Sequence, residues 1–71
     1  SPIIIMEYLE PKRNNLPHQK AATLLLNLGY YAHEILPDGS LNPIHNIEQH
    51  LSINQLDSDN IVFKKIESAE F

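Results

Sequence analysis

The sequence has no cysteine and no tryptophan, and only two of its 71 residues are glycine. Without cysteine the chain can form neither a disulfide nor a thiolate metal site, so packing or a partner must stabilise its core. A chain of this length buries only about 60% of the surface that its unfolded state exposes. We therefore expect a thin core in one small α/β unit that spans residues 1–71.

Basic residues are scarce as well, with five lysines and arginines against nine acidic residues and a net charge of −4. This sign opposes the binding of phosphates, so nucleic acid is not an expected partner. A winged-helix arrangement is disfavoured for the same reason, because its candidate recognition segment, residues 43–51, holds no lysine or arginine.

Long apolar runs are absent too, since the longest covers the four residues 3–6. A membrane span needs about 20 apolar residues, so no membrane partner is expected and a cytoplasmic location is the default. The chain starts at Ser1 and enters this apolar run almost at once, which predicts a fragment of a larger domain. Residues 69–71 are interpreted as a possible cloning remnant.

The first half of the chain predicts a strand followed by a helix. Residues 3–9 are almost continuously apolar and β-branched, which is typical of a strand covered on both faces. A helix is expected from Leu16, with Pro17 in its first turn and leucines at helical spacing up to Leu28. Gly29 is its predicted end, since glycine readily takes the left-handed conformation that closes a helix.

The second half predicts two further strands. Residues 30–36 are rich in strand formers and lead into a turn at 37–40. An extended stretch at 41–44, a short helix with Asn46 near its start, and an irregular polar stretch at 52–60 come next. Residues 61–66 complete the pattern as the last strand. The first two strands should run parallel, because a crossover helix separates them.

No motif of a self-sufficient active site occurs in the sequence. There is no glycine-rich phosphate loop, no nucleophile elbow and no zinc-protease signature. His45 and His50 are the closest histidine pair, but five positions do not place two side chains on one helical face. We therefore predict no catalytic residue, no cofactor-binding residue and no metal ligand in this chain.

Three charged residues are candidates for lining a substrate cleft. Glu7 interrupts the apolar strand near its carboxyl end, and open α/β sheets bind ligands just outside such ends. Lys12 and Arg13 follow the same strand and could contact an anion there. The simpler interpretation is that these side chains are solvated where the strand leaves the core.

Four short motifs occur in an order that resembles a known family. They are an apolar strand ending in glutamate, a helix ending in Leu-Gly-Tyr, an Asp-Gly turn followed by Leu-Asn-Pro-Ile, and an Asn-aliphatic strand, at residues 3–8, 25–30, 38–44 and 60–63. In this respect the chain, from about residue 2 to residue 66, resembles the C-terminal third of the FkbM family of S-adenosylmethionine-dependent methyltransferases.

The resemblance implies a β-α-β-α-β unit with a three-stranded mixed sheet of order 1-3-2, whose last strand is antiparallel, as in the C-terminal part of a Rossmann-like methyltransferase. It implies a parent enzyme for methyl transfer to oxygen, with S-adenosylmethionine bound by a glycine-rich turn and an acidic residue that this chain lacks. The chain alone is expected to be inactive. Among its residues, Glu7 would lie near the catalytic face in an orienting or substrate-lining role.

Two partners fit this hypothesis. One is the remainder of the methyltransferase domain, and the other is a second copy of the chain, because a central strand removed from its sheet leaves an edge and one face bare. The alternative hypothesis is an autonomous acidic module for protein–protein interaction or regulation. Such a module would contain a complete sheet and would bind a basic target.

Overall fold

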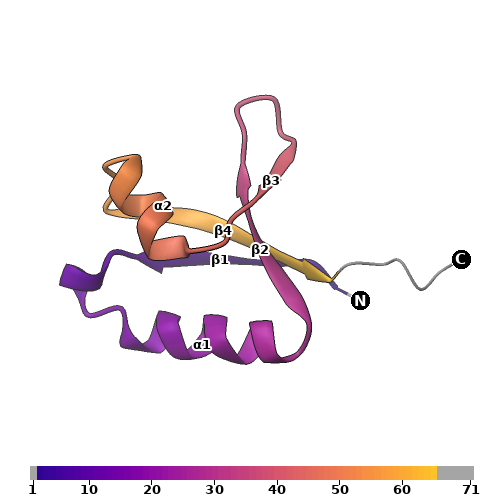
Figure 1. Ribbon diagram of the computed structural model, residues 1–71, viewed down its shortest axis with the longest axis horizontal. Helices are drawn as coiled ribbons and strands as arrows, with labels where there is room; N and C mark the ends of the chain where they lie inside the picture. The colour runs from indigo at the N-terminus through magenta and orange to yellow at the C-terminus, as the bar shows by residue number, and fades with distance from the viewer. Residues whose placement is uncertain (1, 66–71) are drawn as a thin grey trace, which may run out of the picture.

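The computed structural model describes residues 2–65. The chain forms four strands, two α-helices and one turn of 3-10 helix, arranged as a small α/β fold (Figure 1). In chain order the elements are β1 (Ile4–Leu9), η1 (Pro11–Arg13), α1 (Leu16–Asn27), β2 (Tyr30–Ile35), β3 (Leu41–Pro43), α2 (Ile47–Ile53) and β4 (Ser58–Lys65).

The sheet has the order β1-β4-β2-β3, and every pair of neighbouring strands is antiparallel. β4 lies between β1 and β2, which is the position expected for the last strand. β1 and β2 are both antiparallel to β4, so they run in the same direction without touching. The sheet differs from the expected three-stranded mixed one in two respects, because it has a fourth strand and no parallel pair of neighbours.

The fourth strand, β3, is a consequence of the turn that follows β2. The Leu36 N–H donates to the carbonyl of Ser40 over 2.8 Å, and Gly39 takes a φ of +87°. The chain therefore reverses, and Leu41 to Pro43 pair with β2. The extended stretch was predicted, but its pairing was not.

β4 begins three positions earlier than predicted. Ser58, Asp59 and Asn60 form backbone pairs with the carboxyl half of β1, although their side chains are polar. Ladder hydrogen bonds join backbone groups, so a strand can extend past its apolar segment when a neighbour is present. The expected end of this strand at Ile66 lies outside the described residues.

α1 begins and ends where the sequence predicts. Leu16 and Pro17 start the helix, and Gly29 follows it with a φ of +93° while its N–H donates to the carbonyl of Leu26 over 3.1 Å. The leucines of this helix differ in their burial. Leu25 packs against the core, whereas Leu24, Leu26 and Leu28 are each about half exposed or more, at 59%, 49% and 55%.

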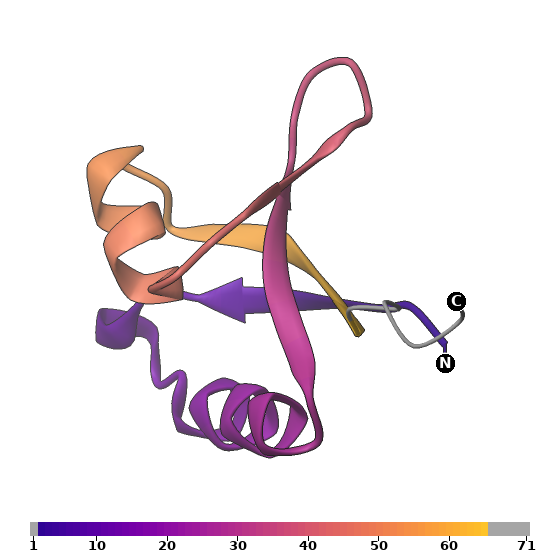
Figure 2. The same ribbon diagram turned by 45° about the vertical axis from the view of Figure 1, so that its right-hand side comes forward.

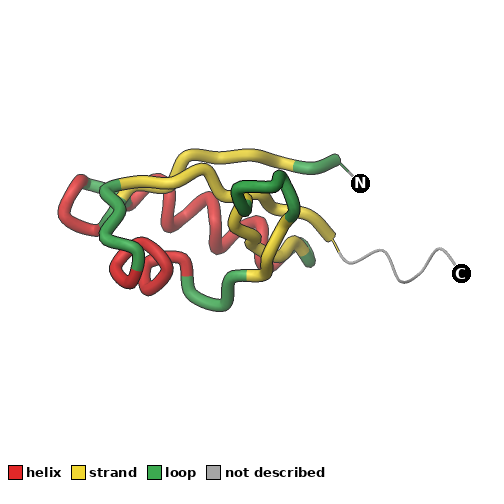
Figure 3. The backbone as a smooth tube through the Cα atoms, turned by 90° about the horizontal axis from the view of Figure 1, so that it is seen from above, coloured by secondary structure: helices red, strands yellow, loops and turns green. Residues whose placement is uncertain are grey.

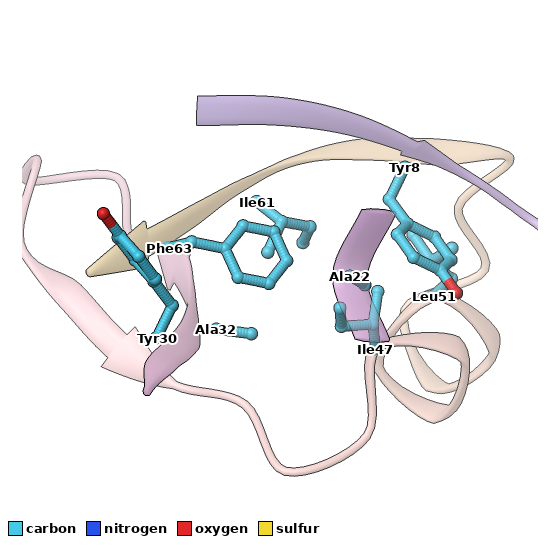
Figure 4. Close-up of a cluster of buried hydrophobic side chains, with 8 residues drawn as sticks. All are labelled: Tyr8, Ala22, Tyr30, Ala32, Ile47, Leu51, Ile61 and Phe63. Atoms are coloured by element: carbon cyan, nitrogen blue, oxygen red, sulfur yellow. The ribbon is translucent and has the colours of Figure 1, made fainter. Parts of the chain in front are cut away.

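The core occupies one face of the sheet. Side chains of both helices pack against the same face, and the close-up in Figure 4 shows this cluster of Tyr8, Ala22, Tyr30, Ala32, Ile47, Leu51, Ile61 and Phe63. In Figure 3 both helices lie on the same side of β1 and β4. The molecule is therefore a sheet with one layer of helices.

The opposite face of the sheet has no helix over it among residues 2–65. It carries the charged Glu7 and the buried Val62 and His33 beside several exposed apolar side chains. Ile5 on β1, and Tyr31 and Ile35 on β2, are 65%, 50% and 46% exposed. The interpretation of residues 3–9 as a strand covered on both faces is wrong for this chain, because β1 is an edge strand whose burial alternates. Near-continuous apolarity therefore reflects a strand with one covered face and one bare face.

None of the helices in the described part of the chain is sufficiently long and apolar to cross a membrane.

Candidate functional site

The clearest hollow near a predicted residue lies beyond the carboxyl end of β1. It has a volume of about 450 Å³ and is enclosed by η1 on one side and by α2 with the loop after it on the other. Figure 2 shows η1 and α2 together at this end of the sheet. The lining residues are Glu10, Pro11, Lys12, Glu48, Leu51, Ser52, Gln55, Leu56 and Asp57.

Of the three predicted site residues, Lys12 lines this hollow. Arg13 lies next to it in η1, and its Nη1 is 3.9 Å from Oδ2 of Asp57. Both side chains of that pair are more than half exposed, so solvent screens their attraction. The hollow holds three carboxylates and a single lysine, so its charge favours a neutral or cationic group over an anion.

Glu7 lies elsewhere. It is an exposed residue on the bare face of β1, opposite Asn60 of β4, and its Oε2 accepts a hydrogen bond of 3.4 Å from the Ser58 hydroxyl. It is not among the residues that line the hollow. The structure therefore does not bring Glu7 together with Lys12 and Arg13.

A network of hydrogen bonds links β1, α1 and α2 beside the hollow. The Tyr8 hydroxyl and the Asn15 amide both donate to Oε2 of Glu48, each over 3.2 Å. The Asn15 amide also donates to the Leu9 carbonyl over 3.0 Å, and the Gln19 amide donates to Oδ1 of Asn15 over 2.7 Å. Asn15 is only 3% exposed, so these bonds satisfy a polar side chain inside the fold.

His18 adds a further link at the same place. Its Nδ1 accepts a hydrogen bond of 3.0 Å from the Leu9 N–H, and its ring meets the Tyr8 ring edge-on with centroids 5.9 Å apart. The tautomer that accepts at Nδ1 carries its proton on Nε2. Side chains from the start of α1 therefore bind both backbone groups of the last residue of β1.

The hydrogen-bonding role of Tyr8 follows from its environment. Burial raises the pKa of Tyr8 to about 12, and the charge of Glu48 and its hydrogen bond add to the effect. The phenol consequently stays protonated at neutral pH and acts as a donor to Glu48. This arrangement suits holding a carboxylate in one orientation and does not suit proton abstraction by tyrosinate.

Glu48 lies between two hollows. A second one, of about 310 Å³, opens on its other side between α1 and the segment that leads into α2. His45, Asn46 and Thr23 contribute to its lining together with apolar side chains. Glu48 is therefore the charged group that two separate surface depressions share.

His50 is largely buried and is held by polar side chains of neighbouring elements. Its Nε2 lies 2.9 Å from Oδ2 of Asp59, its Nδ1 lies 3.9 Å from Oε1 of Glu34, and its side chain is 9% exposed. The amide of Asn54 lies 3.2 Å from Nδ1. These contacts tie α2 to β4 and β2. Across residues 2–65, no group of three or more histidine and carboxylate side chains is placed to hold a metal ion.

Sequence reasoning missed Tyr8, Asn15 and Glu48. Tyr8 was counted with an apolar strand, Asn15 with a polar loop, and Glu48 is 40 positions from Tyr8. The available signals were a tyrosine at a strand end, whose hydroxyl needs a partner when buried, and a carboxylate in the first turn of a helix. Neither signal identifies the partner.

Comparison with known proteins gives no relative for this chain. No family model matches it, no curated protein matches it, and no solved structure matches it. The geometry described above is therefore the basis for a functional assignment.

Proposed function

We propose that this chain is the C-terminal portion of an FkbM-like S-adenosylmethionine-dependent methyltransferase that transfers a methyl group to oxygen. In this role it completes the sheet of the enzyme and borders the substrate cleft, and it is not catalytic by itself. The observation that carries the proposal is the placement of β4 between β1 and β2, antiparallel to both. The sequence resemblance implies the same order for its last three strands.

The open edge of β1 supports the proposal. A strand with the apolar sequence Ile-Ile-Ile-Met is typical of the interior of a sheet, yet within residues 2–65 β1 has β4 as its single neighbour. Ile5 is 65% exposed on the bare face. Another strand beside β1 would pair with its open edge, and a layer over the bare face would bury Ile5.

The hollow beyond β1 supplies a place for substrate under this proposal. Ligands of open α/β sheets bind outside the carboxyl ends of strands, and the hollow lies at that end of β1. Lys12 lines it, and Glu48, held by Tyr8 and Asn15, offers a carboxylate that can accept a hydrogen bond from a hydroxyl group. Glu7 and Arg13 remain predicted substrate-lining residues. They would contact substrate in a part of the cleft that the rest of the domain forms.

S-adenosylmethionine would be bound by the rest of the enzyme. The two glycines of the chain, Gly29 and Gly39, end a helix and form a hairpin turn, respectively. Neither belongs to a glycine-rich turn after a strand, which is the usual cradle of such a cofactor. The chain is therefore assigned the substrate side of the domain.

The test is to recover the coding sequence upstream of Ser1 and to express the extended protein. We expect the extended protein to contain a glycine-rich turn after a strand and to bind S-adenosylmethionine in isothermal titration calorimetry, while the 71-residue chain does not bind it. A start codon directly before Ser1, or an extended protein with no affinity for the cofactor, would refute the proposal.

A substitution in the extended protein tests the hollow. Lys12→Ala should raise the KM for the methyl acceptor by several-fold and leave cofactor affinity unchanged. Lys20→Ala is the matched control, because Lys20 is an exposed lysine on α1 that lines a different depression. Equal kinetic effects of the two substitutions would remove Lys12 from the substrate site.

The alternative function is an autonomous acidic interaction module. The observation that favours it is the exposure of Leu24 and Leu28, which lie one helical turn apart at the end of α1, in a chain with a net charge of −4. Such a surface suits a partner with apolar and basic groups. A native start codon next to Ser1 would favour this module over the methyltransferase fragment.

A further inference from the structure

The two edge strands of the sheet, β1 and β3, differ in how well they are protected against pairing with another chain. β3 is three residues long and includes Pro43, and short strands and prolines discourage pairing with another chain. β1 has six residues and carries neither lysine nor proline, and its first charge is at Glu7. In the part of the chain that the structure describes, β1 pairs with β4 alone. The β1 edge therefore remains available for pairing.

The available part of this edge has a definite end at Leu9. The Leu9 N–H donates to His18 and its carbonyl accepts from Asn15, so both groups point away from β4 and are already bound. At the next residue the Glu10 N–H donates to the carbonyl of Asp57, on the β4 side, over 2.9 Å. Successive residues of a strand thus direct their backbone groups to opposite sides, as a regular ladder requires.

The same alternation locates the backbone groups that can pair. Ile3, Ile5 and Glu7 have the same parity as Leu9, so their N–H and C=O groups point away from β4. Ile4 and Met6 point toward β4, where they face Phe63 and Ile61. The open segment consequently runs from Ile3 to Glu7 and is centred on Ile5.

We propose that the chain forms a symmetric dimer in which β1 pairs antiparallel with β1 of a second copy, with the two-fold axis at Ile5. Identical edges related by a two-fold axis must pair in this way. Ile5 then lies opposite Ile5 of the second copy, and Ile3 lies opposite its Glu7. All the outward backbone groups of the open segment form ladder hydrogen bonds in this register.

Other registers use the edge less well. An axis at Glu7 places two carboxylates directly opposite each other, which is destabilising. An axis at Met6 pairs Ile3 with Leu9 of the second copy, whose backbone groups are occupied by His18 and Asn15. The axis at Ile5 avoids both conflicts.

Charge also favours this register. Extending the β1–β4 ladder by one residue beyond the Ile4–Phe63 pair places Lys64 beside Ile3, on the bare face that also carries Glu7. Glu7 would therefore lie two strand spacings, about 10 Å between Cα atoms, from Lys64 of the second copy. Both side chains are long, so their charged ends can approach each other above the Ile3 side chain that lies between them. The dimer forms two such pairs.

This inference does not rest on the proposed function. It concerns the 71-residue chain by itself and would hold for a methyltransferase fragment or for an interaction module. Within the enzyme of the proposed function, a strand of the remaining domain would fill the same edge. Dimerisation is measured without cofactor or substrate, so the two proposals can fail separately.

The first experiment measures mass against concentration by size-exclusion chromatography with light scattering. We expect the wild-type chain to move from monomer to dimer as concentration rises, and Ile5→Lys to weaken the dimer at least ten-fold. Ile53→Lys is the matched control and should dimerise like wild type, since Ile53 is 71% exposed on α2 and away from the edge. Both substituted side chains are exposed, so neither change disturbs the core.

The second experiment tests the register by cross-linking. The chain has no cysteine, so Ile5→Cys introduces a single thiol. Opposite residues of a hydrogen-bonded pair have Cα atoms about 5.5 Å apart, within disulfide range. Ile5→Cys should form a disulfide-linked dimer under mild oxidation, and Ile35→Cys, exposed on the same face of β2, should not.

Three results would overturn the proposal. A monomer at every concentration would show that the edge does not pair. A dimer that Ile5→Lys leaves intact would place the contact elsewhere, on the exposed leucines of α1 or on the bare sheet face. Equal cross-linking at positions 5 and 35 would indicate stacking of two bare faces in place of edge pairing.

Discussion

The Tyr8 hydroxyl and the Glu48 carboxylate are joined over 3.2 Å although 40 positions separate them in the chain. This bond connects the carboxyl end of β1 to the first turn of α2 (Figure 4 shows Tyr8 directed toward the α2 residues). The bond helps to hold Glu48, which is one of the residues that line the hollow beyond β1.

Replacing Tyr8 by phenylalanine should lower the free energy of unfolding by about 1 kcal/mol, the usual net contribution of one hydrogen bond in a protein. The ring keeps its packing, so the loss reports the hydroxyl alone. Urea denaturation followed by circular dichroism measures it. Tyr31→Phe is the control and should change stability little, because Tyr31 is half exposed. If Tyr8→Phe left the free energy of unfolding unchanged, the hydrogen bond to Glu48 would contribute nothing to stability.

Stability should fall in alkaline solution because of the same residue. The pKa of Tyr8 is raised from 10.0 to about 12 in the folded chain, so the unfolded chain loses this proton at a lower pH than the folded one. The contribution of Tyr8 is fully present below pH 10 and is lost as the pH rises toward 12. Unfolding titrations across this range, in wild type and Tyr8→Phe, should show a decline that is steeper in wild type. Parallel curves would contradict the prediction.

The contact between His50 and Asp59 should contribute more to stability than the contact between Arg13 and Asp57. The first joins a side chain that is 9% exposed to a carboxylate 2.9 Å away, and the second joins two exposed side chains 3.9 Å apart. A double-mutant cycle with alanine at both positions should give a coupling free energy of about 1 kcal/mol or more for the first pair. The second pair should give about zero. A larger coupling free energy for Arg13 and Asp57 than for His50 and Asp59 would contradict this prediction.

Ser40→Ala should raise the pKa of Asp38. Hydrogen bonds from the hydroxyl and backbone N–H of Ser40 hold this pKa below its ordinary value, and the substitution removes the hydroxyl, which is the larger cause. Carboxyl chemical shifts followed by nuclear magnetic resonance against pH measure the change. Ser58→Ala serves as the control, since the Ser58 hydroxyl donates to Glu7. An unchanged Asp38 titration would show that the hydroxyl does not bind it in solution.

The parts of the fold that were predicted correctly have local causes. The end of α1 follows from Gly29, which takes a φ of +93°, and the start of α2 follows from Asn46, whose side chain accepts a hydrogen bond of 3.0 Å from the Gln49 N–H. Each signal acts within a few residues of the boundary that it sets. Propensity and spacing are therefore sufficient to find it.

The parts that were missed depend on distant residues. The polar start of β4 is a strand because Ser58 to Asn60 pair with β1, and the network at the hollow needs Tyr8 and Glu48 from opposite halves of the chain. Lys12 lies near the carboxyl end of β1 because it follows that strand directly. The sequence did not show that Glu7 lies apart from Lys12. Side chains alternate between the two faces of a strand, and this alternation places Glu7 on the bare face of β1.

The central position of β4 has a consequence for synthesis and folding. Among the described strands, β4 is the last that the ribosome would make, and its neighbours β1 and β2 are both made earlier. Neither pair can form until β4 has been made, more than 50 positions after β1 begins, so the sheet has high contact order and its assembly should be slow for its size. Until then the isoleucines of β1 lack their β4 neighbour, and exposed apolar strand edges of this kind favour aggregation.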